Sequence, residues 1–147
     1  MASFATRDEK NNRYVLGPVL IPAQECFDPV ITTNPPLELA YWHWGLETAQ
    51  RWRVRLGLKR NTLWDEVISK LPPLPQAEGL YLVAETAPDS YTNQRYISDH
   101  PAVFGAYGVL PASRLVDPVV MSATFDKIMK VWNWPSTWAP ATKPPSI

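Results

Sequence analysis

The chain has 147 residues, with 14 basic and 14 acidic side chains and a formal net charge of zero. This length corresponds to about one domain, the charge balance argues against a nucleic-acid partner, and the single cysteine, Cys26, excludes an internal disulfide. No stretch approaches the roughly 20 apolar residues of a membrane span, and the N-terminus carries charges where a signal peptide needs an apolar run, so we expect a cytoplasmic chain without a membrane partner.

Proline and tryptophan are both abundant in this chain. The sixteen prolines are about twice the average usage. They lie between helical stretches, so we expect long, ordered loops rather than disorder, and such loops are usually functional. Seven tryptophans are also many for this length. Tryptophan rings suit stacking on flat ligands such as sugars, and packing in a helical core is the alternative.

The N-terminal residues are predicted to be loose or extended. Residues 1–12 are polar and are expected to be loose. Residues 13–22 form a short apolar run that Gly17, Pro18 and Pro22 interrupt, which indicates extended structure. A proline-rich loop follows and leads to the first helix.

The first helix is predicted over Leu37–Leu56. Pro36 suits its first turn, arginines lie near its C-terminal end, and Gly57 ends it. Residues at helical spacing form the apolar stripe that we expect along this helix: Leu37, Tyr41, Trp44, Thr48, Trp52 and Leu56. Further apolar residues lie off the stripe, so the helix is expected to contact protein on more than one side.

A second helix and a strand are predicted next along the chain. The helix covers Asn61–Leu71, and Asn61 is of the residue type that caps a helix N-terminus. The proline-rich residues 72–75 end this helix. Residues 79–86 are extended and are predicted to form one strand of a small hairpin. A short helix is then expected from Pro101 to about residue 110.

The last predicted helix covers residues 119–133. Asp117 and Pro118 precede it and have the residue types of a helix start. Its inward-facing residues are expected to be Met121, Phe125, Ile128 and Trp132. Residues 139–147 lack periodicity, and we expect an unstructured tail there.

One carboxylate, Glu25, lies in the proline-rich loop that precedes the first helix. Its neighbours include Pro22, Cys26 and Phe27. A carboxyl packed among such residues would lose solvation, which raises its pKa, and a raised pKa is what a general acid for glycosidic cleavage needs. The alternative is an ordinary loop glutamate that is exposed or caps the next helix. Asp28 could orient a sugar hydroxyl or form an Asx turn before Pro29, and its position favours the turn.

The histidines and the cysteine give little support to metal or thiol chemistry. His43 and His100 are the two histidines, and they have no HExxH pattern or cysteine partner that would indicate zinc. We expect His43 in the core and His100 at a helix start. A nucleophilic pair of Cys26 with a histidine is conceivable, but only the presence of the two residue types supports it. No metal or cofactor is expected.

Residues 17–52, GPVLIPAQECFDPVITTNPPLELAYWHWGLETAQRW, resemble a segment of the six-hairpin (α/α)6 glycosidases. The nearest comparison is glycoside hydrolase family 65 and its relatives, including family 95. In family 65, a Gly-Pro-Asp-Glu loop precedes an asparagine-rich stretch and a helix rich in Trp, Leu and Ala. Here Gly17-Pro18 begins the loop, Glu25 supplies the acid and Thr33-Asn34 ends the stretch. The chain departs from the pattern because the acid follows eight positions after the glycine, not three, and because Gln24 stands where the family has an acid.

The resemblance covers about residues 13–138 and implies an all-α fold. That fold would consist of α-hairpins of a partial (α/α)6 toroid with long proline-rich loops and one short β-hairpin. A complete toroid has twelve helices and this chain offers about four, so the resemblance implies a fragment from the C-terminal side of the barrel. Glu25 would be the general acid, and the residues expected to contact a carbohydrate substrate are Asn34, Trp42, His100, Trp134 and Trp138.

Two functions of different classes follow from these observations. The first is a fragment of a carbohydrate-active enzyme that cleaves a glycosidic bond with Glu25 as the acid. The alternative is a non-catalytic, truncated helical module or partner-binding domain. Hairpins without their barrel neighbours expose apolar faces, and such faces favour self-association.

Overall fold

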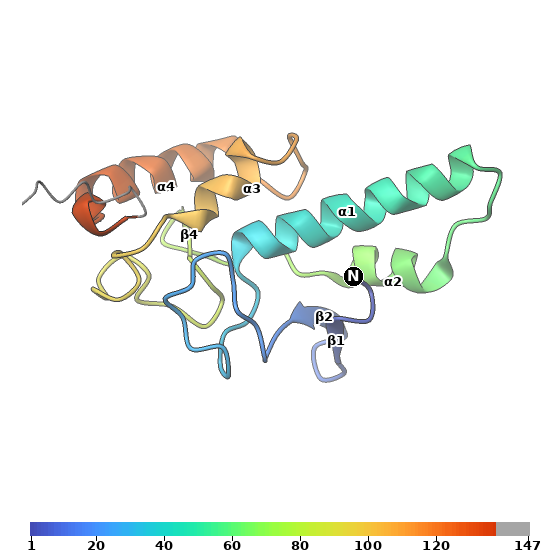
Figure 1. The fold of residues 1–147 in the computed structure, drawn as a ribbon, viewed down its shortest axis with the longest axis horizontal. Coiled ribbons are helices and arrows are strands. Elements are labelled where there is room, and N and C mark those ends of the chain that lie inside the picture. The colour runs from blue at the N-terminus through green and yellow to red at the C-terminus, as the bar shows by residue number, and fades with distance from the viewer. Residues whose placement is uncertain (138–147) are drawn as a thin grey trace, which may run out of the picture.

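The computed structural model describes residues 1–137, and it shows a mainly helical chain with two small antiparallel sheets (Figure 1). Strand β1 (Ala5–Asp8) pairs with β2 (Arg13–Leu16) in a hairpin. The expectation of a loose segment over residues 1–12 is therefore wrong. Alternate residues of the hairpin, such as Tyr14 and Leu16, are buried in the core, and an ion pair of 3.1 Å joins Arg13 Nε to Asp8 Oδ2.

Helix α1 (Pro36–Arg55) is the longest element and runs from the middle of the molecule to its right-hand end in Figure 1. Its bounds differ by one residue from the predicted Leu37–Leu56. Gly57 ends it with a positive φ of 73°, and the Gly57 N–H donates to the Val54 carbonyl while the Leu58 N–H donates to the Arg53 carbonyl. This pair of bonds is a Schellman motif, which needs a left-handed residue at the position of the glycine.

The buried face of α1 differs from the predicted apolar stripe. Tyr41, Trp52 and Leu56 are exposed. The buried side chains lie on another face, which consists of Glu38, Leu39, Ala40, His43, Leu46 and Gln50. Apolar residues surround most of this helix, so contacts with distant segments, rather than hydrophobicity alone, determine which face is buried.

Gln50 is one reason for this orientation, because it fastens α1 to the start of α2 (Thr62–Lys70). Its side-chain amide donates to the Asn61 carbonyl at 2.7 Å and to Asp65 Oδ1 at 2.8 Å, and its oxygen accepts from the Asn61 N–H at 2.9 Å. The Asn61 side chain caps α2 by accepting from the Trp64 N–H, as predicted. Because these hydrogen bonds replace the ones that the amide would make to water, they offset the cost of burying Gln50.

The remaining elements are short except for α4 (Pro118–Val131). The predicted small hairpin is present as two strands of two residues each, and only two of the residues 79–86 that we expect to be extended lie in a strand. The short elements are β3 (Gln76–Ala77), β4 (Leu80–Tyr81), the 3-10 turn η1 (Ala102–Phe104), α3 (Gly105–Gly108) and the 3-10 turn η2 (Trp134–Ser136). Asp117 caps α4 by accepting from the Val119 N–H at 2.8 Å, as the sequence predicts. Among the helices of residues 1–137, none has the length and apolar character that crossing a bilayer requires.

The inward face of α4 is only partly as predicted. Met121, Ile128 and Trp132 are buried, but Phe125 is 48% exposed. Thr124 is fully buried instead. Its hydroxyl donates to the Val120 carbonyl of its own helix, and it accepts from the Tyr81 N–H of β4 at 2.9 Å. A polar residue therefore fixes α4 to the small hairpin.

Asn34 joins three segments that are distant in the sequence. Its side-chain oxygen accepts from the Leu16 N–H of β2 at 2.8 Å, and its amide nitrogen donates to Glu85 Oε2 at 2.5 Å. The Glu85 carboxylate in turn accepts from both terminal nitrogens of Arg13, at 2.7 and 3.2 Å. Burial would raise the pKa of Glu85, but the hydrogen bonds from Arg13 and Asn34 hold it below its ordinary value. We call Arg13, Asn34 and Glu85 the polar knot.

We predict that replacing Asn34 destabilises the fold through two separable effects. Asn34→Gly removes the side-chain hydrogen bonds and should lower the free energy of unfolding by about 2 kcal/mol. Asn34→Ala should cost about 1 kcal/mol more, because Asn34 has a positive φ of 48° that a β-carbon disfavours. Urea unfolding followed by circular dichroism measures both values.

Asn12→Gly is the matched control. Asn12 has the same left-handed backbone, with φ of 49°, but it is exposed. We expect its replacement to change the free energy of unfolding by less than about 0.5 kcal/mol. Equal effects of the Asn34 and Asn12 substitutions would contradict a special role of the polar knot.

Candidate functional site

Glu25 does not lie in the dry environment that the sequence suggested. Its side chain is exposed, while Pro22, Gln24 and Phe27 of the same loop are buried. The buried Gln24 donates from its amide to the Tyr96 carbonyl at 2.6 Å. The loop turns these residues toward the core and leaves the Glu25 carboxylate in solvent, so the predicted desolvation of Glu25 is wrong.

Glu38 is instead the buried carboxyl beside this loop. It lies in the first turn of α1 and is 9% exposed. Its Oε1 accepts from the Ala23 N–H at 2.6 Å, and its Oε2 is buried without a hydrogen-bond partner among the described residues. Burial raises the pKa of Glu38, and the hydrogen bond from Ala23 and the nearby His100 only partly oppose that rise. The sequence did not single out Glu38 as a site residue, although a glutamate two positions after Pro36, in the first turn of the predicted helix, was a usable signal.

The predicted substrate contacts Asn34 and Trp42 have structural roles. Asn34 is fully buried in the polar knot, so its amide is not available to a ligand. Trp42 donates from Nε1 to the Met1 carbonyl at 3.2 Å, and its ring lies 5.4 Å from the ring of Phe4. The indole of Trp42 thus covers the N-terminal segment instead of offering a free stacking face.

The remaining predicted substrate contacts are His100, Trp134 and Trp138. His100 pairs through Nδ1 with Asp99 Oδ1 at 2.7 Å, and Trp134 is partly exposed in η2. Trp138 lies outside the described residues. Within residues 1–137, no hydrogen bond, ion pair or ring contact joins Glu25 to any other predicted site residue. The contacts among the described residues therefore do not link Glu25 to the predicted substrate contacts.

The described residues do not form a metal centre or a reactive thiol pair. No group of three His, Cys, Asp or Glu side chains in residues 1–137 could hold a metal ion. Burial raises the pKa of Cys26, which disfavours its thiolate. His43 is buried in the core, as expected, and burial lowers its pKa.

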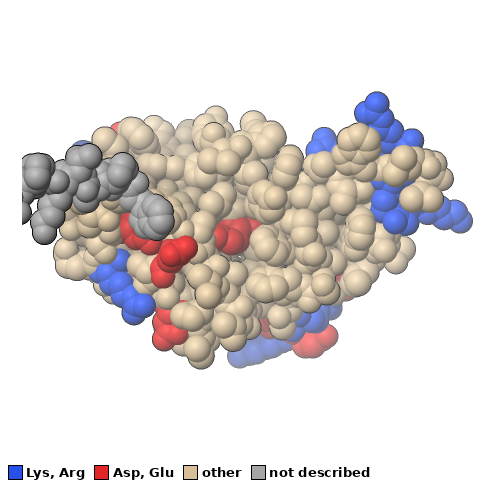
Figure 2. All heavy atoms as spheres, viewed as in Figure 1, with Lys and Arg blue, Asp and Glu red and all other residues tan. Residues whose placement is uncertain are grey.

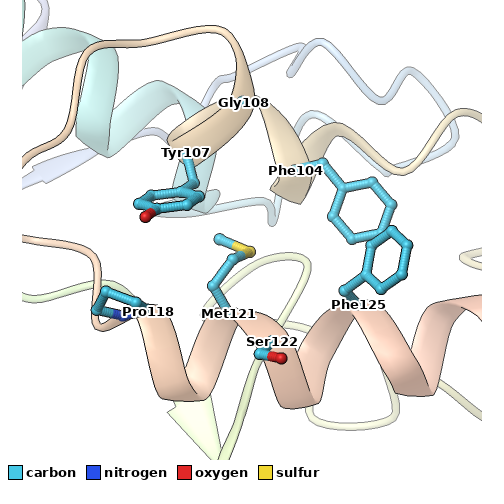
Figure 3. A pocket seen from close by; sticks show the side chains of 7 residues that line it. All are labelled: Phe104, Tyr107, Gly108, Pro118, Met121, Ser122 and Phe125. Atoms are coloured by element: carbon cyan, nitrogen blue, oxygen red, sulfur yellow. The ribbon is translucent and has the colours of Figure 1, made fainter.

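An apolar hollow lies between α3 and α4 (Figure 3). It has a volume of about 470 Å³. The side chain of Met121 points up from α4 toward the ring of Tyr107 on the opposite side, and the rings of Phe104 and Phe125 lie 5.4 Å apart at one end. Seven residues line it: Phe104, Tyr107, Gly108, Pro118, Met121, Ser122 and Phe125. None of them is charged, so the hollow suits an apolar ligand.

Both walls of the hollow are fixed by contacts behind them. A side chain at Gly105 would place its β-carbon 2.8 Å from Leu37 Cδ1, so the glycine permits α3 to pack closely on α1. On the other wall, the hydrogen bond from the Tyr81 N–H to the Thr124 hydroxyl holds α4 against β4. The hollow is therefore preformed, which is the usual condition of a ligand pocket.

Comparison with known proteins adds no relative: no protein-family model, curated protein or solved structure matches this chain.

We predict that Glu38 gives the stability of the chain a dependence on pH. Because its pKa in the folded state is raised, its contribution is fully present below the ordinary glutamate pKa of about 4.3 and is lost as pH rises through the folded-state value. Glu38→Gln cannot ionise, and its oxygen can still accept from Ala23. We expect the free energy of unfolding of this variant not to show that decline. Relative to the native chain, its stability should therefore rise from pH 4 to pH 8.

Glu25→Gln is the matched control, since it removes the same charge from an exposed position of the neighbouring loop. Urea unfolding at pH 4, 6 and 8 measures all three chains. If the two variants show the same pH dependence relative to the native chain, the assignment of Glu38 as the desolvated carboxyl is wrong.

Proposed function

We propose that this chain is a non-catalytic helical module that binds an extended, proline-rich apolar segment of a partner protein in the hollow between α3 and α4. The observation that supports it is the hollow itself, a preformed and uncharged concavity lined by three aromatic rings and a methionine. Its volume lies within the range of about 300–1,000 Å³ that is usual for binding pockets.

The chemistry of the lining favours a proline-rich segment. Aromatic grooves bind such segments because the polyproline II helix is already ordered and loses little entropy on binding. The Tyr107 hydroxyl and the Ser122 hydroxyl provide donors for the carbonyl groups that this conformation leaves free. Met121 adds an adaptable thioether to the floor.

The dimensions of the hollow also favour an extended segment over a helix. The α4 wall extends from Pro118 to Phe125, which corresponds to about 10 Å along the helix axis. Three residues of polyproline II cover about 9 Å. A helix is about 10–12 Å wide with its side chains, and α3 is a single short turn that offers little wall for it.

Glycosidic bond cleavage by part of an (α/α)6 toroid is the competing proposal. Its support is the resemblance of residues 17–52, together with the hairpin of α1 and α2, in which α2 runs back beneath α1 in Figure 1. The solvent exposure of Glu25 and the structural roles of Asn34 and Trp42 weigh against it. We therefore place partner binding ahead of catalysis.

We predict that a synthetic peptide of about ten alternating proline and leucine residues binds to the hollow. Tyr107→Ser should weaken binding about tenfold or more, because it removes one aromatic wall. The control is Met129→Ser, which removes a similarly exposed apolar side chain from α4 outside the lining. Fluorescence anisotropy of the labelled peptide measures affinity, and circular dichroism checks the fold.

Three outcomes would contradict this proposal. The first is equal binding by the native chain and the Tyr107→Ser variant. The second is a native dimer in light scattering that Tyr107→Ser dissociates, because a second copy would then occupy the hollow. The third is turnover of an aryl glycoside that Glu25→Gln abolishes, which would establish catalysis by this chain.

A further inference from the structure

The C-terminal end of α1 and the loop after it form an exposed surface that is both basic and apolar. Residues 51–60, RWRVRLGLKR, contain five cationic side chains and no carboxylate. Figure 2 shows these cations as a blue cluster at the end of the molecule where α1 projects from the body in Figure 1. Four large apolar side chains between them are exposed: Trp52 at 55%, Val54 at 57%, Leu56 at 69% and Leu58 at 50%. We call residues 51–60 the basic tip.

Most of the charge of the basic tip is not neutralised by the protein. Arg60 pairs with Asp65 at 2.5 Å and lies 3.8 Å from Glu47. Across residues 1–137, no carboxylate lies within 4.0 Å of the other four cations, which are Arg51, Arg53, Arg55 and Lys59. The surface therefore has an excess of positive charge that an anionic partner can compensate.

The backbone holds this surface in a defined shape. The Schellman motif at Gly57 turns the chain sharply, and Arg53 Nε donates to the Lys59 carbonyl at 2.9 Å across the turn. Trp52 and Leu56 are four residues apart and share one face of α1. Arg55 lies over the Trp52 ring at 5.3 Å. The basic tip therefore exposes an apolar pair, Trp52 and Leu56, with the Arg55 guanidinium beside it.

We infer that the basic tip binds the surface of an anionic lipid membrane, with Trp52 and Leu56 entering the interface and the arginines contacting lipid phosphates. Tryptophan and arginine are suited to this position, because the ring prefers the headgroup level and the guanidinium reaches the headgroups while its stem stays in apolar surroundings. Nucleic acid offers phosphates but no apolar phase for Val54, Leu56 and Leu58. A lipid surface accounts for both halves of the pattern.

This inference concerns peripheral contact and differs from the sequence-based expectation of no membrane partner. That expectation rests on the lack of a spanning segment, and in the sequence the arginines indicate only the end of a helix. The structure adds that the last residues of α1 are exposed on nearly all sides, with Arg53 alone partly covered. The inference is independent of the hollow between α3 and α4.

Co-sedimentation with lipid vesicles tests the inference. We expect the chain to bind vesicles of phosphatidylcholine with 30% phosphatidylserine at least about tenfold more tightly than vesicles of phosphatidylcholine alone, and to be released by high salt. Trp52→Ala/Leu56→Ala and Arg51→Gln/Arg55→Gln should each weaken binding about tenfold. The matched control is Lys127→Gln/Lys130→Gln, which removes two cations from α4 and should change binding less than about twofold.

Circular dichroism keeps the result interpretable, since all the substituted tip residues are exposed and the variants should keep the native helix content. Absence of binding to the anionic vesicles would overturn the inference. An equal loss in the α4 control would also overturn it, because net charge alone would then explain binding. Tighter binding to a duplex DNA of about 20 base pairs than to the vesicles, at the same salt concentration, would assign the tip to nucleic acid instead.

Discussion

The hydrogen bonds of Asn34 to Leu16 and Glu85, completed by the Arg13–Glu85 ion pair, hold together the parts of this chain that regular structure does not connect. Much of the chain is loop, and its two sheets are too small to provide a frame. The polar knot supplies that frame because it joins β2, the loop that leads into α1 and the segment after β4. A second bond, from the Glu85 N–H to the Thr33 carbonyl, strengthens the same junction.

The knot fixes where α1 begins, and α1 then positions both surfaces for which we propose a role. Near its start, Leu37 packs against Gly105 and sets the place of α3, which forms one wall of the apolar hollow. In its middle, Gln50 fastens α2. Beyond Gln50 the helix leaves the body and carries the basic tip into solvent. One long helix therefore separates a concave apolar surface from a projecting basic one.

Local signals predicted the ends of the helices, whereas long-range contacts decided the site. Asn61 and Gly57 act on their own neighbours through capping and a left-handed turn, so sequence alone places them. The burial of Gln50 depends on groups that a folded α2 supplies, and hydrophobicity does not reveal it. The sequence pointed to Glu25 and not to Glu38 for the same reason. The path of the proline-rich loop determines which of the two carboxyls is buried, and that path depends on long-range contacts. The sequence predicted the mainly helical class but neither the N-terminal hairpin nor the hollow.

A crystal structure of the chain with the proline–leucine peptide would test the central claim most directly. The account predicts that the peptide lies extended between α3 and α4, in contact with Tyr107 and Met121, while the two helices keep their positions. A peptide bound elsewhere on the molecule, or a hollow filled by the chain's own side chains when the peptide is present, would contradict it.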